Sequence, residues 1–107
     1  MTRRRDLSQI TALSKMLLDN DLQHLQKAAT RRNAIAARLT GLAPAEAPGL
    51  NPVTEARLRD RYQVWADGKR MEINLALARA QAEWLEQRDK ATQSLARHDV
   101  LRKLSEK

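Results

Sequence analysis

A single break constrains this chain more than any other feature. Residues 41–52 hold all three prolines and two of the three glycines. Proline lacks a backbone N–H and clashes with the preceding helical turn, so no α-helix can run through this segment. The flanking segments are rich in Leu, Ala, Arg, Gln and Glu, which are strong helix formers. The sequence therefore predicts two long helices, over about 7–40 and 53–104, joined by a turn.

The composition favours an elongated molecule. Hydrophobic residues make up 42% of the 107-residue chain, but aromatic residues are only 3% and phenylalanine is missing. A thin seam of leucine and alanine fits such a composition better than a compact core. We therefore expect one all-α domain over 1–107, an antiparallel two-helix coiled-coil hairpin in which the second helix is longer.

The first helix has predicted signals at both ends. Asp6 and Gln9 form a pair like a capping box, and Gly41 followed by Leu42 is typical of a helix that ends on a C′ glycine. Between these signals, apolar residues alternate at spacings of four and three, which is the heptad rhythm of a coiled coil. The predicted seam positions are 18, 22, 25, 29, 32, 36 and 39, with Arg32 as the one polar member.

The second helix is expected to begin with Asn51 as its N-cap and Pro52 at the first helical position. Gly68 is its weak point, because glycine in a helix costs about 1 kcal/mol relative to alanine. The alternative to one continuous helix is therefore a three-helix arrangement broken at Gly68. Five residues make a second apolar stripe beside the main one: Met71, Leu75, Ala78, Ala82 and Leu85.

The unequal helix lengths predict an overhang. At about 1.5 Å per residue, the two helices span about 50 Å and about 78 Å. If the chain folds back directly after the first helix, that helix runs out opposite roughly residue 86. The C-terminal turns then have no partner within the chain, although a stripe recurs there at helical spacing: Ala91, Leu95, His98, Leu101 and Leu104. Such a stripe predicts a protein partner or self-association.

The aromatic residues are few. Trp65, Trp84 and Tyr62 either pack in the seam or anchor a partner, since tryptophan is enriched at binding hot spots. Of the two tryptophans, Trp84 is expected to face outward, because it lies near the predicted end of the first helix. The candidate partner-binding residues are therefore apolar positions near the helix ends and on the overhang: Ile10, Leu13, Leu17, Trp84, Leu95, Leu101 and Leu104.

No pattern in the chain indicates catalysis. His24 and His98 are the only histidines and lie on different helices, and cysteine is missing, so we expect no catalytic, metal-binding or cofactor-binding residues. The chain is not expected to be an enzyme.

The chain is basic, with a formal net charge of +7. A basic rod suits an acidic protein, a nucleic acid or an anionic membrane surface, and the charge is equally typical of a solvated coiled-coil face. Nucleic acid is disfavoured because aromatic residues do not interleave with the basic ones. No apolar run approaches the length of a membrane span, and no apolar stretch follows Arg3–Arg5, so we expect a cytoplasmic protein without a secretory signal.

The segment 91–107, which ends in a repeated Arg and a Val-Leu-x-x-Leu pattern, resembles the closing segment of the flagellar FliJ and type III secretion YscO family. Members of that family are small, basic, cysteine-poor helical hairpins, and the overall pattern of this chain is similar. The chain is shorter than typical members, and its proline-rich turn departs from their pattern.

The resemblance implies a stalk or adaptor role. It implies a chain peripheral to an export apparatus on the inner membrane, whose ends enter the ring of the hexameric export ATPase and which also contacts the export gate or substrate chaperones. The alternative, which rests on the predicted overhang, is a self-associating structural protein that forms a homodimeric four-helix bundle.

Overall fold

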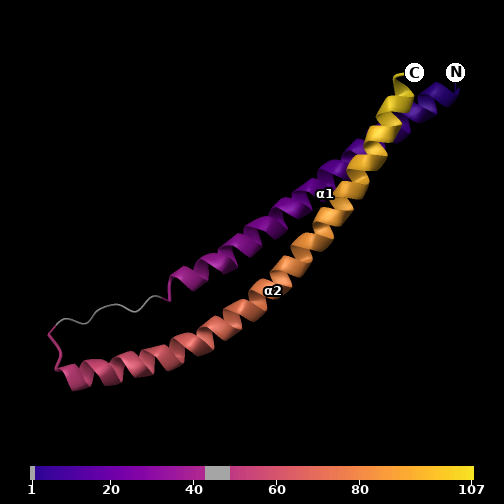
Figure 1. Cartoon of the computed structure of the whole chain (residues 1–107). Helices are drawn as coiled ribbons and strands as arrows, with labels where there is room; N and C mark the ends of the chain where they lie inside the picture. Colours follow the sequence, from indigo (N-terminus) through magenta and orange to yellow (C-terminus); the bar gives the residue numbers. More distant parts are fainter. Residues whose placement is uncertain (1, 43–48) are drawn as a thin grey trace.

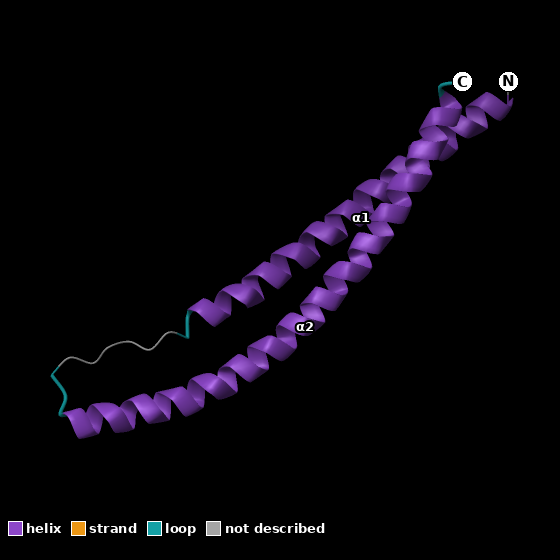
Figure 2. Cartoon of the chain, in the orientation of Figure 1, coloured by secondary structure: helices purple, strands orange, loops and turns teal. Residues whose placement is uncertain are grey.

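The computed structural model describes residues 2–42 and 49–107. Two helices make up the described fold: α1, Thr2–Thr40, and α2, Pro52–Ser105. They pack side by side in antiparallel orientation and form a rod with extents of 86 × 21 × 14 Å, with no strand among the described residues (Figures 1 and 2). The predicted all-α hairpin with a longer second helix is confirmed.

The start of α2 follows the predicted capping chemistry. The Asn51 side-chain oxygen accepts a hydrogen bond from the Val53 backbone N–H at 2.8 Å, and Pro52 occupies the first turn. The amide oxygen thus satisfies one of the backbone donors that a helix leaves unpaired at its start.

The ends of α1 differ from the prediction. The helix begins at Thr2 rather than near residue 7, and its first turn contains no acidic residue, so the pair formed by Asp6 and Gln9 is not a cap. Arginine is a good helix former, and nothing in residues 2–5 interrupts the helix. At the other end, the N–H groups of Gly41 and Leu42 each donate to a carbonyl three residues earlier. Gly41 does not have a positive φ, so α1 ends in a 3₁₀-type turn rather than on a left-handed glycine.

The seam combines leucine and isoleucine with small and polar residues. On α1 the inward positions recur with alternating spacings of four and three: Leu7, Thr11, Ser14, Leu18, Asp21, Leu25, Ala28, Arg32, Ile35 and Leu39. Leu18, Leu25, Arg32 and Leu39 were predicted correctly. Leu22 was wrong as a seam position, because it is exposed and the half-buried Asp21 takes its place. Ala28 is buried beside the half-buried Ala29, and Ile35 and Ala36 are both half-buried.

On α2 the inward spacing is less regular. The same alternation runs from Tyr62 through Ala66 and Ala80 to Glu83, and two steps of four then lead through Gln87 to Ala91. This extra step is a stutter, which locally unwinds the supercoil of two helices. The buried apolar residues of α2 are all alanines, so the two backbones can approach closely.

Figure 1 shows that the overhang lies at the opposite end from the predicted one. The two chain ends lie at the same end of the rod, and α2 extends beyond α1 at the turn. Two contacts between the helices agree with this arrangement: the Thr11 hydroxyl is 2.8 Å from that of Ser105, and the Tyr62 hydroxyl donates to the Leu42 carbonyl at 3.0 Å. Residues 52–61 therefore project past the end of α1. The prediction of an unpaired C-terminus was wrong because it assumed an immediate reversal, whereas a connection of eleven residues can span up to about 36 Å.

Gly68 lies within one continuous helix, so the three-helix alternative is wrong. A Cβ built at Gly68 would meet no atom within 4 Å. We therefore expect Gly68→Ala to raise the free energy of unfolding by about 0.5–1 kcal/mol, since alanine loses less backbone entropy in a helix. Urea unfolding followed by circular dichroism measures the gain.

Gly49→Ala is the matched control. Gly49 also has open space around its Cβ position, but its φ of +91° is one that side chains rarely adopt. We expect this variant to be no more stable than the parent chain. A gain at Gly49 equal to that at Gly68 would contradict the helix-propensity explanation.

Candidate partner-binding surface

The paired end of the hairpin, residues 2–21 of α1 and 94–105 of α2, is held together by polar groups. Ser14 is buried, and its hydroxyl lies 2.9 Å from His98 Nδ1 and donates to the Thr11 carbonyl at 2.7 Å. Farther from the chain ends, the buried Ser94 hydroxyl donates to the Asp21 carboxylate. Among the described residues, no buried side-chain nitrogen or oxygen lacks a hydrogen-bond partner. The polar seam is therefore fully satisfied.

These contacts fix which side chains share a flank. Ile10, Leu13 and Leu17 each directly precede an inward-facing residue of α1, namely Thr11, Ser14 and Leu18. On α2, Val100 and Leu104 directly precede Leu101 and Ser105 in the same way. In an antiparallel pair, the positions directly before the seam residues of both helices lie on the same side.

Five exposed side chains therefore gather on one side of the paired end. We call this group the apolar flank: Ile10, Leu13, Leu17, Val100 and Leu104. Four of the five were predicted as partner-binding residues from their position near the helix ends. Val100 was missed, although its spacing of four from Leu104 was a usable signal.

The other predicted partner-binding residues lie elsewhere. Leu101 is half-buried in the seam, where its carbonyl lies 3.5 Å from the Thr11 hydroxyl. Leu95 is exposed but directly follows the inward-facing Ser94, so it lies on the opposite side of the rod from the apolar flank. The predicted continuous stripe of Leu95, Leu101 and Leu104 is thus distributed over two flanks and the seam.

Trp84 lies in the middle of the hairpin and not near the end of α1. The Arg32 guanidinium stacks over its ring at 4.4 Å from the centroid, and that of Arg88 lies at 5.3 Å. The Arg31–Glu83 ion pair, at 2.6 Å, joins the two helices one position away. The prediction that Trp84 faces outward was wrong, because α1 extends past it and covers it in part.

Trp65 is the exposed tryptophan, at 52% of its surface. Its ring lies 5.6 Å from that of Tyr62, and it lines a shallow groove with Leu42, Ile73 and the stems of Arg38 and Lys69. The groove is at the turn end of the rod, far from the apolar flank.

The paired end also carries a charged network on α2. Arg102 donates to Asp99 at 2.7 Å, Lys103 lies 3.0 Å from the same carboxylate, and Arg102 also reaches Glu106. The Arg102 hydrogen bond, with help from Lys103, lowers the pKa of Asp99, and Asp99 in turn raises the pKa of Arg102. These side chains are about half exposed, and they keep the end of α2 charged around the apolar flank.

The described residues offer no arrangement for metal chemistry, since no three metal-ligating side chains converge among them. His98 is occupied in the seam, and His24 is exposed on α1. In the part of the chain that the structure describes, neither helix has a stretch apolar enough to cross a bilayer. Comparisons of the chain with protein-family models, curated proteins and solved structures find no match in any of the three.

Proposed function

We propose that this chain is a non-enzymatic stalk or adaptor that binds a protein partner through the paired end of its hairpin. The observation that carries the proposal is the apolar flank, five large side chains exposed on one side of an end where both helices meet. A contiguous exposed apolar surface with a charged border is typical of a protein-binding site. The rod behind it, 86 Å long, provides reach rather than a pocket.

The charge around the flank indicates an acidic partner. Arg97 directly precedes the inward-facing His98, so it lies on the same side as the apolar flank. Arg3, Arg4 and Arg5 are exposed on the first turns of α1 beside it. Acidic groups at the rim of a partner surface would accelerate association with this end and orient it.

The resemblance to the FliJ and YscO family makes the proposal more specific. We propose that the partner is the ring of a flagellar or type III secretion export ATPase, with the export gate or chaperones as further partners. In this proposal the chain works in the cytoplasm at an export apparatus on the inner membrane. A narrow antiparallel coiled coil with both ends at one tip suits insertion into such a ring, and this arrangement supports the proposal.

The experiment compares two leucine variants at opposite ends of the rod. The double variant Leu13→Asp/Leu17→Asp places two charges in the apolar flank and is expected to lower affinity for the cognate export ATPase at least 100-fold. Leu58→Asp is the matched control, since Leu58 is exposed on the overhang of α2. Pull-down and ATP turnover with the purified ATPase are the measurements.

Each result has a clear meaning. Binding and stimulated turnover with the parent chain and with Leu58→Asp, lost in the double variant, support the proposal. No binding by the parent chain contradicts the export-ATPase role. Equal binding by the double variant contradicts the assignment of the apolar flank. Circular dichroism of each variant verifies that the hairpin is folded.

A further inference from the structure

The outer face of α2 carries a second apolar surface far from the paired end. We call it the outer stripe: Gly68, Met71, Leu75, Ala78, Ala82 and Leu85. Met71 is 74% exposed and Leu75 is 55% exposed, and the two alanines between Leu75 and Leu85 are exposed as well. From Met71 onward the spacings are four, three, four and three, which is the rhythm of a coiled-coil seam. The stripe is therefore a second seam on a helix that already has one.

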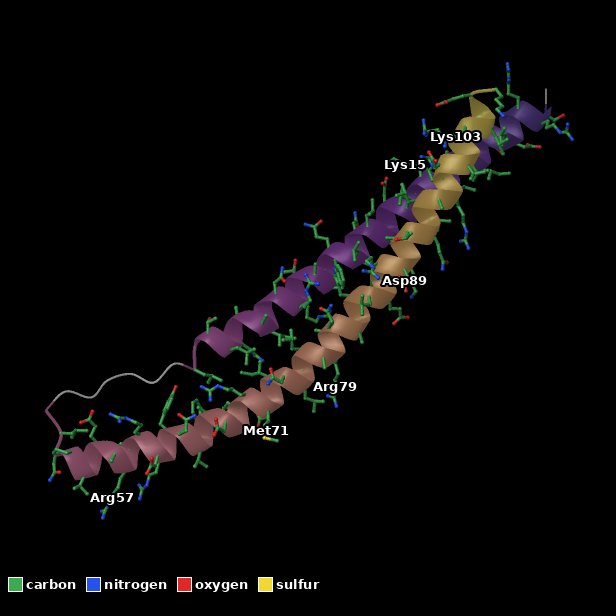
Figure 3. All side chains as sticks on the ribbon, viewed as in Figure 1. Lys15, Arg57, Met71, Arg79, Asp89 and Lys103 are labelled. Atoms are coloured by element: carbon green, nitrogen blue, oxygen red, sulfur yellow. The ribbon has the colours of Figure 1, made fainter. Side chains whose placement is uncertain are left out.

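Helix α1 does not cover the outer stripe. The inward positions of this part of α2 are Ile73, Ala76 and Ala80, which alternate with those of the stripe. Figure 3 shows Met71 and Arg79 pointing away from α1, on the far side of α2. Within the described part of the chain, the stripe thus has no helix packed against it.

We propose that the outer stripe binds the outer stripe of a second copy of this chain, with the two α2 helices antiparallel. The sequence of the stripe is self-complementary in this orientation. With the twofold axis between residues 76 and 77, Leu75 faces Ala78 of the other copy, Met71 faces Ala82, and Leu85 faces Gly68. Every layer then pairs a large side chain with a small one, which is how closely packed helices interdigitate.

The charges beside the outer stripe favour the same orientation. In this register, Glu72 lies beside Arg79 of the other copy, and Asp67 lies beside Arg88. The twofold axis repeats each pair, so four opposite-charge contacts border the interface. Parallel packing would instead place Asp67 beside Glu72 of the other copy, and like charges at such positions are unfavourable. Charge and shape thus both favour a second copy of this chain, with its α2 antiparallel to the first.

Within one chain, Asp67 pairs with Arg70 at 2.8 Å and Arg88 lies over the Trp84 ring, whereas Glu72 and Arg79 are available. Glu72 has one exposed partner, Lys69 at 3.3 Å, and this kind of pair contributes little. Arg79 is exposed and makes no ion pair with any described residue. Glu72 and Arg79 are two helical turns apart, about 10 Å, so they do not contact each other within one chain.

The proposed dimer extends beyond the stalk function. Antiparallel packing through the middle of α2 places the two paired ends at opposite ends of the assembly, with both apolar flanks free. The homodimer expected from the sequence relied on the C-terminal residues, which the structure pairs with α1. The outer stripe is a different surface and is tested separately.

A charge exchange tests the proposal. Glu72→Arg and Arg79→Glu, each alone, place like charges in two symmetric contacts and are expected to weaken the dimer about tenfold. The double variant Glu72→Arg/Arg79→Glu restores opposite charges and is expected to recover the parent dissociation constant. Because the two residues do not touch within one chain, such recovery requires contact between chains. Arg57→Glu, on the exposed overhang, is the matched control and is expected to leave the constant unchanged.

The measurement is sedimentation equilibrium of the full chain from micromolar to millimolar concentration. Leu75→Asp is expected to give a folded monomer throughout, with unchanged helicity by circular dichroism. A parent chain that stays monomeric, a dimer that persists in Leu75→Asp, or a double variant no tighter than the single ones would each overturn the proposal. Leu13→Asp/Leu17→Asp is expected to leave the dimer unchanged, so loss of ATPase binding and loss of dimerisation are distinguishable.

Discussion

Leu18→Asp is expected to abolish the folded hairpin. Leu18 is 5% exposed and lies between two polar contacts of the paired end, that of Ser14 with His98 and that of Asp21 with Ser94. An aspartate there would bury a carboxylate without a partner, at a cost of about 3 kcal/mol or more. Two helices with a narrow seam bury little surface, so their margin of stability is small. Circular dichroism at 25 °C should therefore show loss of most helical signal.

The control for this prediction is the neighbouring residue. Leu17→Asp introduces the same side chain one position earlier, where the leucine is 62% exposed. We expect the free energy of unfolding of that variant to lie within about 0.5 kcal/mol of the parent value, because a solvated aspartate on a helix surface costs little. If both variants unfold to the same extent, Leu17 is also a core residue and the seam register described above is incorrect.

Ser94→Ala is expected to lower the free energy of unfolding by about 1–3 kcal/mol. The Ser94 hydroxyl donates to the half-buried carboxylate of Asp21, and the variant leaves that charge without its donor. The double variant Asp21→Ala/Ser94→Ala removes the charge as well. We expect it to be at least as stable as the parent chain and up to about 1 kcal/mol more stable, since alanine is the better helix former.

Urea unfolding of the parent chain, the two single variants and the double variant completes a double-mutant cycle. The predicted pattern is a loss in Ser94→Ala that disappears when Asp21 is also replaced. Additive losses in the double variant would show that the two side chains do not interact in solution.

Local chemistry made the helices predictable. Proline and glycine in 41–52 had to end both helices, and Asn51 with Pro52 carried a capping signal that needed no tertiary information. Gly68 was also resolved correctly as part of one helix, because one glycine costs less than a long helix gains from packing.

The seam register and the overhang depended on contacts between the helices. Leu18 and Leu25 fit a seam through either Asp21 or Leu22, and hydrophobicity alone selects Leu22. The structure uses Asp21 because Ser94 lies across from it and donates to its carboxylate. Likewise, helix lengths alone could not show at which end the longer helix projects, since that depends on the span of residues 41–51.

The candidate binding surface was partly predictable for the same reason. Ile10, Leu13, Leu17 and Leu104 could be chosen because large apolar residues near helix ends recur with helical spacing. Their grouping on one flank required the pairing of Ser14 with His98 and of Thr11 with Ser105. Leu95 and Trp84 could not be excluded from the sequence, because their surroundings depend on the same pairing.

The contact of Thr11 with Ser105, close to the two ends of the chain, determines how this rod responds to force. Tension applied between these two residues would peel the helices apart from the paired end, one layer of side chains at a time. Each layer there holds a few hydrogen bonds and small side chains, so this direction is mechanically weak. Compression or torsion along the 86 Å axis instead loads every layer at once. The rod is thus expected to resist compression and torsion better than tension applied at its ends.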